Sequence, residues 1–204
     1  MNVLLILFFC LVSVGWSKNF IPQSFNANFE ESLVSMATGK VKKSYGKIDY
    51  KFPGHVRFEI SSPNPSLFVS NPQSSWYYVP PFVKGEEGQV TIQKTSRLPL
   101  TKFFDSMKNG LEGSKLFSHE YSKNNLILNF KKQFQKEMTL KQVIFHSSAE
   151  AKSVNKMSQF EKFTLIYVDG RKVDLKFTEF KEDVSFPSTN FEFTPPPKTR
   201  VIKD

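Results

Sequence analysis

A two-residue alternation of apolar and polar side chains is the feature that most constrains what this chain can fold into. In residues 50–78 it appears in three short segments, separated by the turn-rich sequences SSPNPS and SNPQS. Such alternation between turns is typical of strands that have one covered face. We therefore predict a β-meander in which most of six alternating apolar residues face one concave apolar surface: Val56, Phe58, Ile60, Val69, Trp76 and Tyr78.

The same alternation recurs along most of the chain and predicts roughly ten strands. The Asp-Gly pair at residues 169–170 lies between two strand patterns, which is a strong β-hairpin signal. No internal repeat interrupts the series. The segments with strand character are 40–45, 47–51, 56–61, 67–70, 76–79, 89–93, 117–121, 125–131, 138–145, 160–168, 172–178 and 190–193.

Two segments have apolar residues at helical rather than strand spacing. An amphipathic helix is predicted over residues 21–38, and a second helix, or two short pieces, over residues 99–111. Residues 152–160 could add a further helical turn. The predicted apolar stripes are Phe25, Phe29, Leu33 and Met36 in the first helix, and Leu100, Phe103, Phe104 and Met107 in the second.

These elements together predict the fold class. An antiparallel sheet of about ten strongly twisted strands tends to curl or to close into a barrel. We predict a mainly β (α+β) protein in which a curled antiparallel sheet forms an incomplete β-barrel. Two or three helices would cover its concave face as a lid, and residues 18–204 would form a single domain.

The first seventeen residues have the character of a cleavable signal peptide. The apolar run from Val3 to Val14 is shorter than the about 20 residues that cross a membrane, and Gly15 and Ser17 suit cleavage before Lys18. An uncleaved membrane anchor is the alternative. Residues 1–17 are therefore predicted to direct export and to be removed.

The lone cysteine, Cys10, lies inside this segment. Bulky Phe8 and Phe9 precede it and apolar residues follow it, so it does not form a lipid-attachment site. After cleavage the chain would contain no thiol and would be stabilised by its core alone. The absence of disulfides in an exported protein suggests that it resides in a bacterial periplasm rather than in an extracellular space.

Charge and aromatic content bear on the kind of partner. The net charge is +9, but the lysines are scattered, so a solvated surface is favoured over an acidic partner or a nucleic acid. Phenylalanine is abundant, with 22 residues in 204. It could reflect ordinary core and composition bias, or a large apolar interior that does not close on itself.

No motif for catalysis or metal binding is present. His55, His119 and His146 are far apart in the sequence, and none has metal-ligand spacing to another histidine or a carboxylate. Nucleophile elbows, zinc-protease helices and glycine-rich phosphate loops are absent. We expect no catalytic residue, no metal and no cofactor, so an enzyme or a purely structural exported protein is disfavoured.

Several short motifs resemble the LolA family of periplasmic outer-membrane lipoprotein carrier proteins. The segment SFNANFEESL is similar to the family's N-terminal helix, and KFPGHVRFEI matches its next motif at Pro53, Val56 and Phe58. VSNPQSSWYYVPP is similar to a third motif, including Trp76 and Tyr78, and FEFTPPPKTRVI to the closing one. The resemblance covers nearly the whole chain after residue 18.

The resemblance implies an incomplete β-barrel lidded by helices and a function without catalysis. Its cargo would be acylated lipoproteins, received from an inner-membrane ABC transporter complex and passed to an outer-membrane lipoprotein acceptor. The six meander residues would bind cargo and the two helical stripes would form the lid. A periplasmic monomer is expected. Lacking a cysteine after its signal, the chain does not fit the anchored acceptor of the same fold.

This sequence departs from the family at two positions that bear on the lid and the cavity. The family's arginine, which latches the lid by hydrogen bonds, aligns with Phe52, and its tryptophan aligns with Phe58. Phenylalanine cannot make the hydrogen bonds of the latch, so apolar packing of the lid is the expected replacement at this latch position. The alternative function is another periplasmic protein that binds lipids or apolar ligands on the same half-barrel fold.

Overall fold

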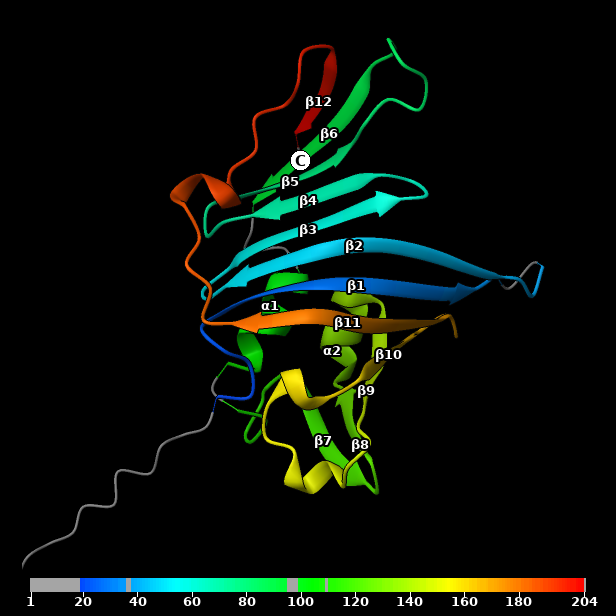
Figure 1. The fold of residues 1–204 in the computed structure, drawn as a ribbon, viewed down its shortest axis with the longest axis vertical. Coiled ribbons are helices and arrows are strands. Elements are labelled where there is room, and N and C mark those ends of the chain that lie inside the picture. The colour runs from blue at the N-terminus through cyan, green and yellow to red at the C-terminus, as the bar shows by residue number, and fades with distance from the viewer. Residues whose placement is uncertain (1–18, 36–37, 95–98, 109, 204) are drawn as a thin grey trace, which may run out of the picture.

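The computed structural model describes residues 19–35, 38–94, 99–108 and 110–203, and the described part contains one sheet of twelve strands. The strand order is β12-β6-β5-β4-β3-β2-β1-β11-β10-β9-β8-β7, so the N-terminal strand is near the middle (Figure 1). The sheet curls but its edge strands, β12 and β7, do not meet. The mainly β fold with an incomplete barrel is confirmed.

The strands follow the predicted meander in most of the chain. β12 runs parallel to β6, whereas the other neighbouring strands of this described sheet are antiparallel. Segments 40–45 and 47–51 are one continuous strand. The bounds are β1 Ser24–Val34, β2 Val41–Lys51, β3 His55–Ser62, β4 Ser66–Ser70, β5 Ser74–Val79, β6 Gly88–Lys94, β7 Phe117–Ser122, β8 Asn125–Phe130, β9 Leu140–His146, β10 Lys162–Tyr167, β11 Lys172–Glu182 and β12 Thr199–Lys203.

Two α-helices, α1 (Pro99–Ser106) and α2 (Lys132–Met138), lie on one side of the sheet, behind β1 and β11 in Figure 1. We call this side the inner face and the opposite side the outer face. Short 3-10 turns occupy Ala151–Ser153, Met157–Gln159 and Ser188–Phe191. Within the described residues, no helix is long and apolar enough to cross a membrane.

The predicted helix over residues 21–38 is wrong, because Ser24–Val34 is strand β1. Its apolar residues Phe25, Phe29 and Leu33 are four apart, and four is a multiple of the strand period as well as about one helical turn. The buried Ala27 completes the two-residue alternation. Since β1 pairs with both β2 and β11, tertiary pairing decides between the two periods. Met36 and the predicted signal peptide lie outside the described residues.

The core lies between the inner face and the two helices. Phe25 and Tyr50, both fully buried, come from the central strands, while Met107 and Phe134 contribute from the helical side. The chain before β1 joins the same core, because Ile21 is also fully buried. The helices are therefore attached to the sheet mainly by apolar contact.

The outer face is covered in part by the chain between β11 and β12. Phe193 packs on Tyr78 with ring centroids 5.1 Å apart, and Asn190 donates to the Asp49 carboxylate at 3.1 Å. The strand predicted at 190–193 is wrong, since Ser188–Phe191 forms a 3-10 turn. This segment packs across the outer face and connects β11 to β12.

Candidate functional site

The inner face carries an aromatic pair at its centre. The rings of Phe29 on β1 and Phe58 on β3 are stacked, with centroids 4.5 Å apart and planes 12° from parallel. Gly46 lies between them on β2, directly opposite Phe29 and Ile60. A Cβ at Gly46 would lie 2.4 Å from Phe29 Cζ and 2.0 Å from the Glu59 carbonyl oxygen. The absence of a side chain at Gly46 therefore makes room for the pair.

A second aromatic group joins the sheet to α1. Phe25 stacks on Phe180 at 4.8 Å and also contacts Tyr50 and Phe104 at centroid distances of 5.3 and 5.9 Å. Phe180 reaches this side because β11 has an irregularity opposite Ala27. There Glu179 adopts a positive φ of 52°. Such a bulge changes the direction of the next side chain.

The inner face is only partly covered. Beneath the helices it is filled by the protein's own side chains, whereas Phe58, Ile60 and Phe68 further along the sheet are half-buried. Over β4, β5 and β6, Phe68 and the exposed Tyr77 help to line an open hollow of about 320 Å³. The apolar surface thus extends beyond the part that the helices cover.

One acidic side chain interrupts this apolar surface. Glu31 on β1 pairs across the sheet with Leu175 on β11 and with Ser44 on β2, so it shares the face of Phe29. Burial raises the pKa of the Glu31 carboxyl above its ordinary value. The carboxylate is therefore costly to keep ionised at this position.

Polar contact between α1 and the sheet is made through Asp105. The Tyr50 hydroxyl donates to Asp105 Oδ1 at 2.9 Å, and the Gly54 backbone N–H donates to Oδ2 at 3.0 Å. Burial raises the pKa of the Asp105 carboxyl, although these two hydrogen bonds act in the opposite direction. Burial also raises the pKa of the Tyr50 hydroxyl, which therefore remains a donor at neutral pH.

Phe52, the predicted latch position, lies between these two donors in the sequence. Its side chain is half-buried and packs against the core, and its backbone N–H donates to the Gln23 carbonyl at 2.9 Å. The two hydrogen bonds to Asp105 thus come from residues two positions before and two positions after Phe52. Sequence reasoning missed both Asp105 and Tyr50.

The six predicted meander residues lie on two faces, not one. Paired residues of neighbouring strands share a face, and Val56 pairs with Ser70 while Arg57 pairs with Val69. The turn between β3 and β4 sets this register, which alternation within each strand does not reveal. The inner face receives Val56, Phe58 and Ile60, and the outer face receives Val69, Trp76 and Tyr78.

The predicted lid residues of the second helical segment lie against the core. Phe103 and Phe104 on α1 are buried, as is Met107 just after it, whereas the side chain of Leu100 falls outside the described residues. Phe25, Phe29 and Leu33 belong instead to the inner face that the helix covers. Phe163 and Phe177 of the C-terminal half join them, with ring centroids 4.9 Å apart.

Comparison with known proteins identifies the family. The family described as "Outer membrane lipoprotein carrier protein LolA" matches residues 22–194. The chain belongs to the LolA family. An outer-membrane lipoprotein carrier protein of Francisella tularensis subsp. novicida is 26% identical over 185 residues, 89% of this chain and 82% of that protein. The carrier protein of Photobacterium profundum is 24% identical over 181 residues, 88% and 82% of the two chains.

Among solved structures, a LolA superfamily protein from Nitrosomonas europaea aligns with a TM-score of 0.44 and 12% identity, covering 87% of this chain and 94% of that one. Family membership confirms the resemblance found in the sequence. In this LolA family member, Asp105 accepts hydrogen bonds from Tyr50 and Gly54.

Proposed function

We propose that this protein is a periplasmic carrier that shields the acyl chains of lipoproteins on its inner face. The observation that carries the proposal is an apolar, aromatic-lined face that is covered by a short helix rather than by a second sheet. Each methylene removed from water contributes about 0.8 kcal/mol, so a long acyl chain needs such a surface. The names of its relatives support the same cargo.

In this proposal α1 is the movable cover. Its residues Phe103 and Phe104 occupy the space against Phe25 and Phe130 that acyl chains would take. Loading would displace α1 and break the contacts of Asp105 with Tyr50 and Gly54. The exposed cargo surface would include the three predicted residues on the inner face, which are Val56, Phe58 and Ile60.

Release follows from the same chemistry. Apolar contacts are non-directional, so one face can accept acyl chains of different lipoproteins and return to its own packing when they leave. The step requires no bond to be made or broken, and we propose that the protein is not an enzyme. The three outer-face residues, Val69, Trp76 and Tyr78, would support the sheet instead of touching cargo.

The route is proposed from family membership. Cargo would come from an inner-membrane ABC transporter complex and go to an outer-membrane lipoprotein acceptor, with the carrier acting as a monomer in the periplasm. Residues 1–17 would serve as the cleaved signal peptide. The relatives' names describe carriage of outer-membrane lipoproteins and support the cargo, whereas the two partners are proposed from the resemblance found in the sequence.

Native mass spectrometry of the protein isolated from periplasmic extract tests this function. We expect bound species with the masses of acylated lipoproteins. Phe58→Glu should abolish them, because it places a carboxylate on the apolar face. Val168→Glu is the matched control, since Val168 is 55% exposed in the β10–β11 loop.

The possible results separate two functions. Lipoprotein masses on the parent protein and the control, but not on Phe58→Glu, would support the carrier. Free fatty acid or phospholipid in place of lipoprotein would favour the alternative, an apolar-ligand binding protein on the same fold. Full cargo loading by a folded Phe58→Glu protein would contradict the assignment of the inner face.

A further inference from the structure

The loop that joins β5 to β6 exposes an aromatic side chain almost completely. Phe82 is 95% exposed, more than any other large hydrophobic residue of the described chain, and Val83 beside it is 52% exposed. Isolated exposed apolar residues are common, but adjacent ones on a projecting loop form a patch and indicate an interaction. We call residues 80–87 the tip loop.

The structure holds the tip loop away from the body. β5 and β6 stay paired up to Val79 and Gln89, and a turn in the loop is closed by a hydrogen bond from Glu86 N–H to the Val83 carbonyl at 3.1 Å. Gly88 N–H donates to the Lys198 carbonyl at 3.2 Å and ties the loop end to β12. In Figure 1 the loop forms part of one extremity of the long axis.

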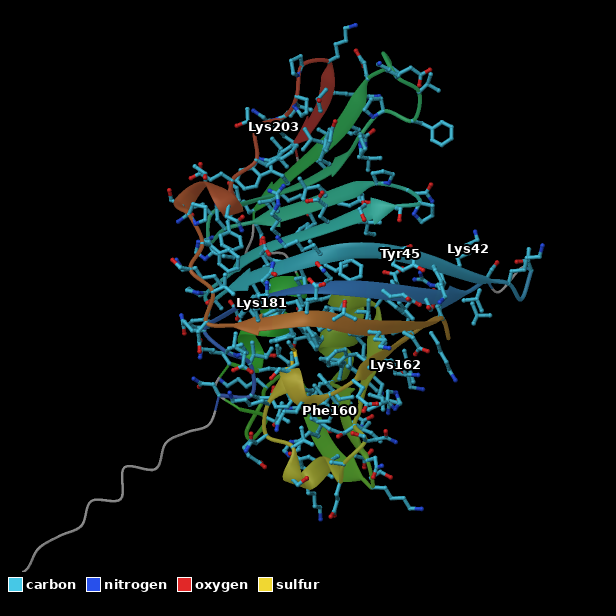
Figure 2. All side chains as sticks on the ribbon, in the orientation of Figure 1. Lys42, Tyr45, Phe160, Lys162, Lys181 and Lys203 are labelled. Atoms are coloured by element: carbon cyan, nitrogen blue, oxygen red, sulfur yellow. The ribbon has the colours of Figure 1, made fainter. Side chains whose placement is uncertain are left out.

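More exposed apolar surface lies at the same end of the sheet. Tyr77 and Val79 on β5 are 49% and 39% exposed, and Val201 on β12 is 47% exposed. Lys203, which ends β12, lies beside β6 in this upper part of the molecule (Figure 2). By strand pairing, Tyr77 and Val79 lie on the inner face and Val201 on the outer face, so exposed apolar side chains occur on both faces of the sheet near the tip loop.

The charged residues around the tip loop slightly favour binding to an anionic surface. Lys84 in the loop and Lys198 and Arg200 at the start of β12 are exposed, and Glu86 and Glu87 oppose them. The whole chain carries a net charge of +9. Basic residues next to an apolar insertion point are attracted to anionic lipid headgroups.

We propose that the tip loop inserts Phe82 and Val83 into the interface of a lipid bilayer. A bilayer interface accepts a protruding aromatic ring without a shaped pocket, whereas a protein partner needs a complementary cavity. Two inserted side chains give only weak membrane affinity, so association would be brief and reversible. This contact does not depend on the acyl-chain cargo, because the tip loop is separate from the inner face beneath α1.

Vesicle flotation without cargo tests this inference. We would use vesicles of phosphatidylethanolamine and phosphatidylglycerol and protein whose N-terminus has been determined by sequencing. Phe82→Glu should lower vesicle association by about tenfold, because an aromatic anchor is replaced by a charge. Val168→Glu, an equally drastic change at another exposed loop residue, should leave it unchanged.

A fluorescent reporter at position 82 tests directly whether this side chain enters the bilayer. Phe82→Trp should show a blue-shifted emission on adding vesicles and quenching by brominated lipids, measured as a difference from the parent protein, which contains Trp76. Unchanged emission, or flotation of Phe82→Glu equal to that of the parent, would overturn the proposal. The proposal would also be overturned if Phe82→Glu floats normally but no longer binds a purified partner protein, because the tip loop would then contact a protein and not a bilayer.

Discussion

Replacing Asp105 with alanine tests whether the helix α1 is a releasable cover. The substitution removes the acceptor of two hydrogen bonds, from Tyr50 at 2.9 Å and from Gly54 at 3.0 Å. Hydrogen bonds to a charged group contribute about 1.5–3 kcal/mol each. Burial of the carboxylate, which raises its pKa, offsets part of this gain. We therefore expect α1 docking to weaken by about 2 kcal/mol, which corresponds to roughly 30-fold more molecules with α1 displaced.

Hydrogen exchange of the α1 amides measures that population, and binding of a fluorescent fatty acid measures access to the inner face. Both should increase in Asp105→Ala. Lys102→Ala is the matched control on the same helix, because it removes only the partly exposed ion pair with Glu137, at 2.9 Å. Such pairs contribute about 1 kcal/mol or less. Exchange rates in Asp105→Ala equal to those of the control would refute the cover mechanism.

The same carboxylate predicts a dependence on pH. Because burial raises its pKa in the closed form, protonation of the Asp105 carboxyl is more favourable there than in the open form. The part of the closed-state stability that depends on this proton is complete below the ordinary carboxyl pKa and is lost as the pH rises through the raised value, whereas the two hydrogen bonds to Asp105 remain. Asp105→Asn keeps an oxygen acceptor without the charge, so at neutral pH it should hold α1 at least as firmly as the parent. It should also flatten the pH profile of exchange, and a profile equal to that of the parent would contradict this.

Three further predictions concern the sheet and the N-terminus. Gly46→Ala should lower the free energy of unfolding by about 3 kcal/mol in denaturant titration, because its Cβ meets the Glu59 carbonyl oxygen at 2.0 Å; an unchanged midpoint would contradict this. Glu31→Leu should raise the thermal midpoint at pH 7, since the raised pKa of Glu31 means that ionisation opposes folding. N-terminal sequencing of the exported protein should find a start at or near Lys18, and retention of Met1 would refute cleavage.

The two-residue alternation of apolar and polar side chains predicted strands well where the prediction concerned a single strand and not its partners. The Asp-Gly signal at 169–170 marks the β10–β11 hairpin, in which Arg171 N–H donates to Asp169 Oδ1 at 3.0 Å and Gly170 has a φ of +86°. The helix predicted from residue 99 is α1, which ends at Ser106. These elements depend on nearby residues, so their sequences contain the information that forms them.

The sequence-based predictions were wrong or incomplete where the structure depends on contacts that the local sequence does not reveal. α2 has a single buried residue, Phe134, so it shows no apolar stripe, and sequence reasoning missed it. The face of Val69 depends on the register between β3 and β4. The contact of Asp105 with Tyr50 joins residues 55 positions apart, and neither residue signals the other. The apolar character of the inner face could thus be predicted, but only three of the six predicted meander residues, Val56, Phe58 and Ile60, lie on it.

The position of β1 in the middle of the sheet also constrains when the protein can fold. β1 pairs with β2 on one side, but its other neighbour is β11, which starts at Lys172. The central strand β1 therefore cannot pair on both sides until nearly the whole chain has been synthesised. Such long-range pairing makes folding slow, because loop closure must precede the contacts that stabilise it. We expect the nascent chain to remain extended until late in synthesis, a state in which it could be threaded through a narrow channel.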